Sequence, residues 1–461
     1  MDIKKNDEYT VLIEDIGSDG AGIGKIGTFP LFIKDTVIGD KVRTKVIKLK
    51  KNYGYGRLME VLAPSPHRVP PRCEVARQCG GCTFQHLSYE KQLEYKQNKV
   101  KNCLERIGGL KGIAEKMEPI IGMENPYHYR NKAQFPVGRN KEGKIITGFY
   151  AGRTHSIIEN DHCCIQAKEN DAILKILKSY MEQYNIAPYD ESSHTGLVRH
   201  FLTRVGYDTG QIMVCLVLNG SPSKLPKKEA LIQELTQIKG MTSIVANENK
   251  EKTNKILGIR TTTLWGKDYI EDKIGDVKYQ IGPLSFYQVN PIQTRVLYGK
   301  ALEFAALTGT ETVWDLYCGI GTISLFLAKK ARQVYGVEII PEAIDDARRN
   351  AQINGIQNVE FFVGKAEEVL PAKYEESGGA MHADVIVVDP PRKGCEESLL
   401  KTIVDMQPKK VVYVSCDPAT LARDLKYLTG CGYEVRRVQP VDMFGFSFHV
   451  ETVVGLQRKD I

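Results

Sequence analysis

The sequence lacks several features that would place it outside the ordinary globular proteins. No apolar run approaches the ~18–20 residues that a membrane-spanning helix needs, so we expect no membrane association. The first eight residues are polar and lack the apolar core of a signal peptide, which predicts a cytoplasmic protein. There is no internal repeat and no low-complexity segment. The length of 461 residues indicates two to four domains, at roughly 100–200 residues per domain, and nothing predicts an obligatory protein partner.

Cysteine is present in an odd number, 11 residues, and its spacing is uneven. In the expected cytoplasmic setting a disulfide framework is excluded, and metal binding or thiol chemistry fits better. Cys73, Cys79 and Cys82 lie close together in the sequence, and Cys163 and Cys164 are adjacent. Three such thiolates need a fourth ligand to form a metal site, and either member of the adjacent pair could supply it. The residues alone favour neither an iron–sulfur cluster nor zinc.

Residues 1–64 read as a small β-barrel of the TRAM or OB type, with glycine-rich turns between short strands. Between Lys41 and Arg57 there are seven basic residues and no acidic one, with Tyr53 and Tyr55 among them. Basic residues interleaved with aromatics are typical of a nucleic-acid-binding barrel. A charged edge that discourages strand aggregation would look the same, so both interpretations stay open here.

A proline-rich connector follows, and the rest of the chain divides into two further predicted domains. Residues 65–283 read as a central α+β domain that carries the cysteine cluster. Within it, residues 87–107 predict an amphipathic helix with Ser88 as its N-cap, which we expect to pack on the C-terminal domain. Residues 284–461 alternate apolar strands with helical stretches, which predicts a parallel, doubly wound, Rossmann-like α/β domain.

Three strand ends in the C-terminal domain carry ligand-binding motifs. The first strand leads into a D-x-x-x-G-x-G turn with Gly319 and Gly321, which lets backbone approach a ligand. The second strand ends in Glu338, where a carboxylate can accept both hydroxyls of a ribose. The third ends in Asp389, followed by two prolines; this D-P-P turn is typical of S-adenosylmethionine (SAM) methyltransferases rather than of dinucleotide dehydrogenases. The alternative is that Glu338 and Asp389 only cap helices.

The stretch 411–418, Val-Val-Tyr-Val-Ser-Cys-Asp-Pro, reads as a buried strand that ends in a polar turn. Its Cys416 lies at the ligand edge of the predicted sheet, which favours a nucleophile over the packing role that a lone cysteine usually has. Carbon 5 of uracil is a methylation target that needs such a nucleophile, because thiolate addition at carbon 6 activates it. Glu451, among apolar strand residues, is the candidate base, and burial would raise its pKa. The alternative for Glu451 is an edge-strand salt bridge.

Taken in order and spacing, the motifs resemble those of the RNA uracil-C5 methyltransferase family. The motifs are Leu284-Ser-Phe-Tyr-Gln-Val-Asn-Pro, Asp315-Leu-Tyr-Cys-Gly-Ile-Gly, Val388-Asp-Pro-Pro-Arg-Lys-Gly, Val414-Ser-Cys-Asp-Pro and His449-Val-Glu-Thr. The N-terminal barrel resembles the TRAM domain of that family. The resemblance implies that SAM is bound by Gln288, Tyr317, Glu338 and Asp389. It also implies that Cys416 is the nucleophile, that Glu451 is the base, and that Phe286 holds a flipped base.

The resemblance also implies a [4Fe–4S] cluster and an RNA substrate. The family's cluster takes its fourth ligand from a Cys-x-Ile motif, which selects Cys163 to join Cys73, Cys79 and Cys82; zinc is the alternative metal. Because the family's tRNA branch usually lacks both barrel and cluster, the resemblance favours bacterial 23S rRNA. A flipped uracil in RNA needs its backbone held. The candidates for that contact are Arg130, Lys132, Arg199, His200 and Arg204.

Other functions remain open at this point. The chain could methylate uracil in tRNA, or it could be a nucleobase N-methyltransferase whose D-P-P turn holds an amine. The N-methyltransferase would keep activity without Cys416, whereas uracil-C5 chemistry would lose it. A non-enzymatic RNA-binding protein with a degenerate methyltransferase fold is disfavoured by the intact motifs, and a failure to bind SAM would revive it.

Overall fold

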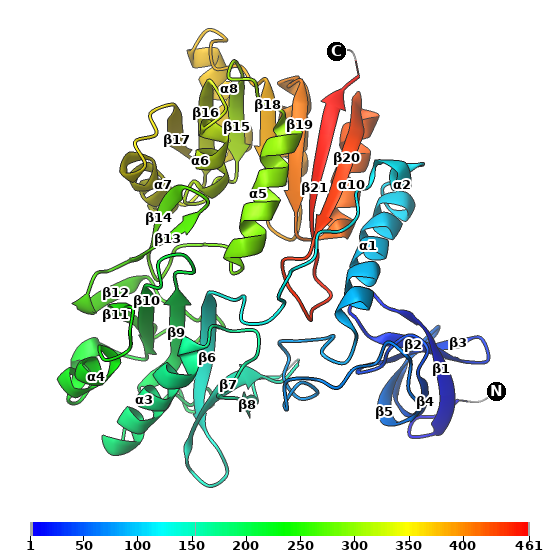
Figure 1. Ribbon diagram of the computed structural model, residues 1–461, viewed down its shortest axis with the longest axis vertical. Coiled ribbons are helices and arrows are strands. Elements are labelled where there is room, and N and C mark those ends of the chain that lie inside the picture. The colour runs from blue at the N-terminus through cyan, green and yellow to red at the C-terminus, as the bar shows by residue number, and fades with distance from the viewer. Residues whose placement is uncertain (1–2, 153, 460–461) are drawn as a thin grey trace.

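The computed structural model describes residues 3–152 and 154–459, which build a closed barrel, two seven-stranded sheets and a two-stranded hairpin (Figure 1). The barrel is N-terminal, a central sheet follows, and the C-terminal sheet lies at the other end of the molecule. The fold class predicted from the sequence, a small barrel followed by α+β and Rossmann-like α/β parts, is confirmed for the barrel and for the α/β part.

The barrel is formed by β1 (Glu8–Ile16), β2 (Gly22–Ile26), β3 (Phe29–Ile33), β4 (Lys41–Leu49) and β5 (Gly54–Ala63), closed in the order β1-β2-β3-β5-β4. Alternate residues point inward and form a small apolar core that includes Val11, Leu31 and Val42. On its outside, the rings of Phe32, Tyr53 and Tyr55 lie 5.6–6.0 Å apart. Part of the predicted basic stretch is neutralised, because Arg43 pairs with both Glu8 and Glu60.

The central sheet has helices on one face and the C-terminal half of the chain on the other. Its order is β12-β11-β10-β9-β6-β7-β8. The strands are β6 (Lys132–Arg139), β7 (Ile145–Tyr150), β8 (Ile157–Glu159), β9 (Val198–Val205), β10 (Ile212–Leu218), β11 (Met241–Glu248) and β12 (Arg260–Gly266). Helices α3 (Glu169–Gln183) and α4 (Lys228–Leu235) bury one face, and a 3-10 turn, Pro222–Lys224, precedes α4. Residues of the other face join the apolar core around the hairpin β13 (Ile270–Ile274) and β14 (Val277–Ile281).

The C-terminal sheet has the order β17-β16-β15-β18-β19-β21-β20. The strands are β15 (Thr312–Leu316), β16 (Gln333–Glu338), β17 (Val359–Val363), β18 (Val385–Val388), β19 (Lys410–Ser415), β20 (Tyr433–Val441) and β21 (Glu451–Arg458). The helices are α5 (Pro291–Ala305), α6 (Thr322–Ala328), α7 (Pro341–Ile353), α8 (Ala366–Glu376), α9 (Glu397–Asp405) and α10 (Pro418–Gly430). Five strands are parallel, as predicted, but β21 runs antiparallel to both of its neighbours. The last two strands therefore form a hairpin that the sequence pattern did not reveal.

Helix α1 (Tyr89–Arg106) lies against the C-terminal sheet, although it precedes the central sheet in the sequence (Figure 1). Its Val100 and Leu104 share a buried apolar cluster with Leu421 and Leu425 of α10, and the short α2 (Ile113–Lys116) follows on the same side. The helix begins after Ser88 as expected, but the Ser88 side chain makes no capping hydrogen bond.

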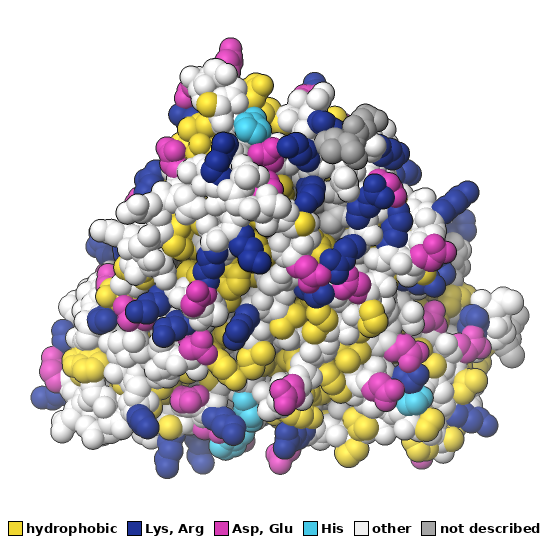
Figure 2. All heavy atoms as spheres, turned by 45° about the horizontal axis from the view of Figure 1, so that its top comes forward, with side chains coloured by type: hydrophobic (Ala, Val, Ile, Leu, Met, Phe, Trp, Pro, Cys, Tyr) yellow, Lys and Arg dark blue, Asp and Glu magenta, His cyan; other side chains and the backbone are white. Residues whose placement is uncertain are grey.

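The surface carries charges of both signs. On the face shown in Figure 2, lysine and arginine side chains are scattered among aspartate and glutamate rather than gathered into one basic patch. The formal net charge of +7 is therefore distributed on this face. None of the helices in the described part of the chain is both long and apolar enough to span a membrane.

Candidate active site

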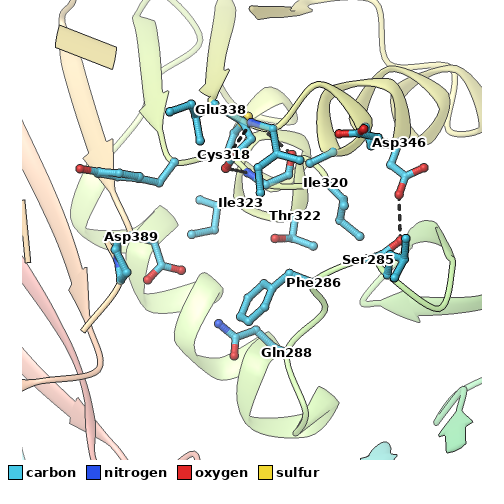
Figure 3. Close-up of a pocket in the computed structure, with 18 of the residues that line it drawn as sticks. Ser285, Phe286, Gln288, Cys318, Ile320, Thr322, Ile323, Glu338, Asp346 and Asp389 are labelled. Carbon is cyan, nitrogen blue, oxygen red and sulfur yellow. Dashed lines mark hydrogen bonds between the residues drawn. The ribbon is translucent and has the colours of Figure 1, made fainter. Parts of the chain in front are cut away.

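A cavity of about 1840 Å³ opens at the carboxyl ends of the parallel strands, where open α/β sheets bind ligands. The sequence predicted six residues for the SAM and catalytic sites, and all six line this cavity. They are Gln288, Tyr317, Glu338, Asp389, Cys416 and Glu451. Figure 3 shows Gln288, Phe286, Glu338 and Asp389 arranged around one space, with Thr322 and Ile323 of α6 between them. Tyr317, Glu338, Asp389 and Cys416 meet because the carboxyl ends of neighbouring parallel strands share one edge of the sheet, where Glu451 begins the antiparallel β21.

The turn after β15 brings backbone to the cavity in a strained conformation. Tyr317 has a φ of 92°, unusual for a residue with a side chain, and Gly319 and Gly321 also have positive φ values. The N–H groups of Tyr317 and Cys318 both donate to the Val337 carbonyl at 3.0 Å, which fixes the turn to the neighbouring strand. Strain of this kind is held in place by its surroundings and is common at ligand sites.

Glu338 ends β16 and faces both the turn and the next helix. Its carboxylate accepts hydrogen bonds from the N–H of Gly319 at 3.3 Å and from the N–H of Ile340 at 3.1 Å. Helix α7 has no side-chain cap, so these hydrogen bonds fix the carboxylate to the two turns and do not cap the helix, and the carboxylate faces the cavity. A carboxylate at this place, fixed by two backbone donors, is well oriented for hydroxyl groups of a ligand.

Two acidic side chains interact beside the cavity: Asp389, which lines it, and Asp315 on the neighbouring strand. Asp315 of β15 is fully buried; Ser324 donates to its Oδ2 at 2.5 Å, while its Oδ1 has no partner among the described residues. Burial raises the pKa of Asp315 to about 7. Burial, and then the charge of Asp315, raise the pKa of Asp389 to about 7 as well. Two neighbouring carboxyl groups with raised pKa values favour binding of a cationic ligand, whose charge would relieve both shifts.

Cys416 sits in the turn between β19 and α10. Asp417 caps the helix by accepting the N–H groups of Ala419 at 2.9 Å and Thr420 at 3.2 Å, and Pro418 occupies its first turn. This capping fixes the half-buried thiol at the helix N-terminus. Burial, followed by the charges of Glu451 and Asp389, raises the pKa of Cys416 to about 12, while Arg392 opposes the shift. The resting thiol is therefore protonated at neutral pH.

Glu451 begins β21 and faces the same cavity. Ser415 pairs with Thr452 across the antiparallel β19 and β21, so the next position of this register places Cys416 opposite Glu451. Side chains directly opposite each other have Cβ atoms about 4.5–5.5 Å apart. Glu451 is 4% exposed, and burial, with help from Asp389, raises its pKa to about 8, while Arg392 lowers it. A carboxyl group with this pKa can accept a proton near neutral pH.

Gln288 and Phe286 come from the segment between β14 and α5. Asn131 holds this segment, because its side chain donates to the Gln288 carbonyl at 3.0 Å and its N–H donates to the Val289 carbonyl at 2.8 Å. Asn290 caps α5 by accepting the N–H of Gln293. Phe286 is 70% exposed although it is a large apolar side chain, and it projects into the cavity (Figure 3). An exposed ring at such a place can stack on a planar ligand.

The prediction that Arg199, His200 and Arg204 hold the RNA backbone is wrong, because β9 lies inside the central sheet and all three side chains are buried. Arg199 donates to the carbonyls of Asn249 and Glu251. Arg204 donates to the carbonyl of Ser285, next to Phe286. Both arginines therefore support loops. Among the other two candidates, Arg130 lines the cavity and Lys132 is half-buried.

The five clustered cysteines come together from two segments. Gln85 Nε2 donates to Cys164 Sγ at 3.2 Å and to Cys82 Sγ at 3.6 Å. A hydrogen bond between Cys73 and Cys164 lowers the pKa of Cys73 and raises that of Cys164. Within residues 3–152 and 154–459, however, no three His, Cys, Asp or Glu side chains are arranged so that they could hold a metal ion. The structure thus shows the convergence of the thiols and does not show a metal centre.

Three cavity-facing or supporting residues were not selected from the sequence. Asp315 opens the glycine motif, and its place in an apolar strand was the available signal. Arg392 directly follows the D-P-P turn, and its charge acts on both Cys416 and Glu451. His449 lines the cavity two residues before Glu451, and burial lowers its pKa to about 4, so it is neutral.

Fold and cavity together define a SAM-dependent methyltransferase, and the comparisons with known proteins identify its family. Residues 88–459 match the model of the tRNA (uracil-5-)-methyltransferase family and residues 4–59 match the TRAM domain, so the chain belongs to that family. An RNA methyltransferase of uncharacterised specificity from Halalkalibacterium halodurans is 53% identical over 459 residues, covering 99% of this chain and 98% of the relative. A second, from Clostridium tetani, is 51% identical over 453 residues, covering 98% and 96%.

Among solved structures, the tRNA (uracil-54, C5)-methyltransferase of Pyrococcus abyssi, in complex with S-adenosyl-L-homocysteine, is similar over nearly the whole length. It aligns with a TM-score of 0.78 and 29% identity, covering 97% of this chain and 100% of the other. The chain is thus a SAM-dependent RNA methyltransferase of the uracil-5 type.

Proposed function

We propose that the chain methylates carbon 5 of a uridine through a covalent intermediate, with Cys416 as nucleophile and Glu451 as base. The observation that carries this proposal is that the β19–β21 ladder ends at Ser415 and Thr452, next to Cys416 and Glu451, which both line the cavity that also holds Asp389 and Glu338. A thiol and a carboxyl group facing one space are what addition and elimination at a ring require.

Each step uses a group that is in place. Cys416 Sγ releases its proton to the solvent and adds to carbon 6 of uracil, and the electrons of the C5–C6 double bond move to form an enolate at O4. Carbon 5 then attacks the methyl group of SAM, forming the C5–CH3 bond and releasing S-adenosylhomocysteine. Glu451 takes the proton from carbon 5, the double bond re-forms, and Cys416 leaves carbon 6 as a thiolate. Arg392 favours the charged forms of both residues.

For SAM itself, we propose Gln288, Tyr317, Glu338 and Asp389 as binding residues. Glu338 would accept hydrogen bonds from the ribose hydroxyls, since its orientation is fixed by Gly319 and Ile340. The raised pKa values of Asp389 and of Asp315 on the neighbouring strand support a cationic group nearby, and SAM carries a sulfonium and an ammonium. Phe286, exposed at the opposite wall, would stack on the flipped uracil.

The proposed RNA is bacterial 23S rRNA, with tRNA as the second candidate. The match of residues 4–59 to a TRAM domain supports an extended RNA-binding surface, and the exposed side of the barrel carries the Phe32, Tyr53 and Tyr55 rings. The specific observation in favour of tRNA is the Pyrococcus abyssi neighbour, whose described substrate is uracil 54 of tRNA.

We further propose that Cys73, Cys79, Cys82 and Cys163 hold a [4Fe–4S] cluster, with zinc as the alternative. The backbone N–H two residues after a cysteine hydrogen-bonds to its sulfur at Cys73, Cys79 and Cys163. Each such N–H···S bond favours the thiolate that a metal needs, although burial outweighs it at Cys79 and Cys163 and raises the pKa of both thiols. Cys163 receives two such backbone N–H groups, from Ile165 and Gln166, which supports it as the fourth ligand. The cluster would be structural, and no chemical step involves it.

The deciding experiment is in vitro methylation of 23S rRNA and of bulk tRNA from cells that lack this gene. Nucleoside mass spectrometry should find 5-methyluridine in the rRNA, and mapping of the fragments would locate it. Methyl transfer to tRNA with none to rRNA would overturn the rRNA assignment but leave the chemistry intact. A methyl group on a base nitrogen would overturn the chemistry.

A further inference from the structure

The loop Asp442–Val450 joins β20 to β21 and ends at Glu451. In Figure 1 it reaches away from the C-terminal sheet, toward α1 and the N-terminal half of the molecule. Three of its residues, Phe444, Ser447 and His449, line the cavity. Because Glu451 directly follows the loop, the position of its carboxyl group depends on how the loop is held.

A buried ion pair fixes the start of this loop. Lys96 of α1 donates to Asp442 Oδ1 at 2.6 Å, and both side chains are fully buried. Tyr89 of the same helix donates to Asp442 Oδ2 at 2.7 Å. Lys96 also donates to the Phe444 carbonyl at 2.9 Å. A charged pair is buried at a high desolvation cost, and removing one partner leaves the other uncompensated.

Residues from the N-terminal half hold the middle of the loop. The N–H groups of Thr83 and Phe84 both donate to the Phe446 carbonyl, at 2.7 and 2.9 Å, and Thr83 directly follows Cys82. Gln92 of α1 accepts the N–H of Phe446 at 3.0 Å. Phe446 has a φ of 62°, a left-handed conformation that a bulky residue keeps only when its surroundings impose it.

The barrel reaches the end of the loop. Phe448 packs with Ile16 and Val37 of the barrel segment. Lys99 of α1 donates to the Phe448 carbonyl and to the Ser18 carbonyl, both at 3.1 Å. Helix α1, the residues after Cys82 and the barrel therefore hold the start, the middle and the end of the loop that leads to the proposed base, Glu451.

We propose that Tyr89 and Lys96, with Asp442, are positioning residues for Glu451, so that α1 sets the rate of proton removal from carbon 5. The inference rests on the proposed function. Misplacing a base by a fraction of an ångström slows the step it performs without weakening substrate binding. Since methyl transfer precedes proton removal, a misplaced Glu451 should let the methylated Cys416–RNA adduct accumulate.

The test uses Tyr89→Phe, which removes one hydroxyl and keeps the ring, in the full-length purified protein. We expect kcat to fall about tenfold with kcat/KM unchanged, because methyl transfer precedes the slowed step, and we expect a SAM-dependent, denaturant-resistant protein–RNA complex on gels. Asp442→Asn, which keeps the shape of the side chain, is the second variant. The matched control is Tyr433→Phe, because Tyr433 also donates a buried hydroxyl, to the Pro408 carbonyl at 3.0 Å, at the far end of β20.

The Glu451→Gln variant distinguishes a failure of the positioning role from a failure of the proposed covalent chemistry. If Glu451→Gln traps the complex and both Tyr89→Phe and Asp442→Asn behave like the control, the positioning role is overturned and the chemistry stands. If Glu451→Gln traps no complex, the role of Glu451 as the base is overturned, and the proposed function fails together with the positioning role. A Tyr89→Phe variant that loses turnover and complex together would show a structural role only.

Discussion

Cys416 and the five cysteines around Gln85 differ in what faces their sulfur atoms. Cys416 lies at the end of β19, opposite a glutamate and near an aspartate, on the wall of a large cavity. The clustered thiols face backbone N–H groups, an amide side chain and one another. Burial, and then the charges of Glu451 and Asp389, raise the pKa of Cys416. Among the clustered thiols, a hydrogen bond with Cys164 lowers the pKa of Cys73, while the pKa values of the other four are raised, mainly by burial at Cys79, Cys82 and Cys163. The surroundings of the sulfur atoms, a cavity wall with carboxyl groups in one case and other thiols in the other, thus distinguish the proposed nucleophile from the proposed metal ligands.

The comparison also explains why the two regions are connected. Thr83 and Phe84, which follow Cys82, hold the Phe446 carbonyl in the loop before Glu451. The residues that follow Cys82 therefore connect the clustered thiols to the loop before the proposed base, Glu451. The cavity around Cys416 and the clustered thiols differ in chemistry but are joined by this segment. The following predictions test the two regions separately.

The largest effect is expected from Cys416→Ala. Removing a covalent nucleophile should lower methylation by at least about 10³-fold, measured with labelled SAM in single turnover, while calorimetric SAM affinity stays unchanged. Cys431→Ala is the control, because Cys431 is an exposed thiol outside the cavity and should keep full activity. Substantial methylation by Cys416→Ala would point to the N-methyltransferase.

Glu338→Ala tests the cofactor side of the catalytic region. Losing two hydrogen bonds to a charged acceptor should weaken SAM binding about 10- to 100-fold in calorimetry, with RNA affinity unchanged. Glu360→Ala, an exposed acid on the neighbouring β17, provides the control. Equal SAM affinity in both variants would mean that Glu338 only fixes the turn.

The pH dependence of kcat, measured at saturating RNA and SAM, follows from the carboxyl group of Glu451. Glu451 must be ionised to accept a proton, and its pKa of about 8 predicts that the rate rises from pH 6 until above pH 8. Arg392 lowers the pKa of Glu451 and of Cys416, so Arg392→Gln should shift the rise to higher pH. A profile that shifts to lower pH, or does not move, would contradict this role.

The smallest effect on the chemistry is expected from the clustered thiols. Cys163→Ala should remove bound iron and sulfide from protein purified without oxygen, whereas the adjacent Cys164→Ala should retain both. Elemental analysis and visible absorption measure this directly. Zinc in place of iron would support the alternative metal. Loss of iron from Cys164→Ala, with iron retained in Cys163→Ala, would make Cys164 the fourth ligand instead of Cys163.

Much of the site could be predicted because strand ends carry their own signals. Apolar strands that end in Glu338, Asp389 and Cys416 meet at one edge in any parallel sheet. What could not be predicted depends on partners distant in the sequence. Arg204 was predicted to hold the RNA backbone, but neighbouring strands bury it, and its acceptor, the Ser285 carbonyl, lies 81 residues away. The ion pair between Lys96 and Asp442 joins residues 346 positions apart, and no local sequence pattern predicts it either.

The most direct measurement uses RNA with 5-fluorouridine at the target position. Fluorine cannot leave carbon 5 as a proton does, so Glu451 cannot complete elimination and the adduct should persist in the wild-type protein. Mass spectrometry of the digested complex should then find the methylated fluorouracil joined to the peptide that contains Cys416. An absent adduct, or one on another cysteine, would contradict covalent catalysis by Cys416.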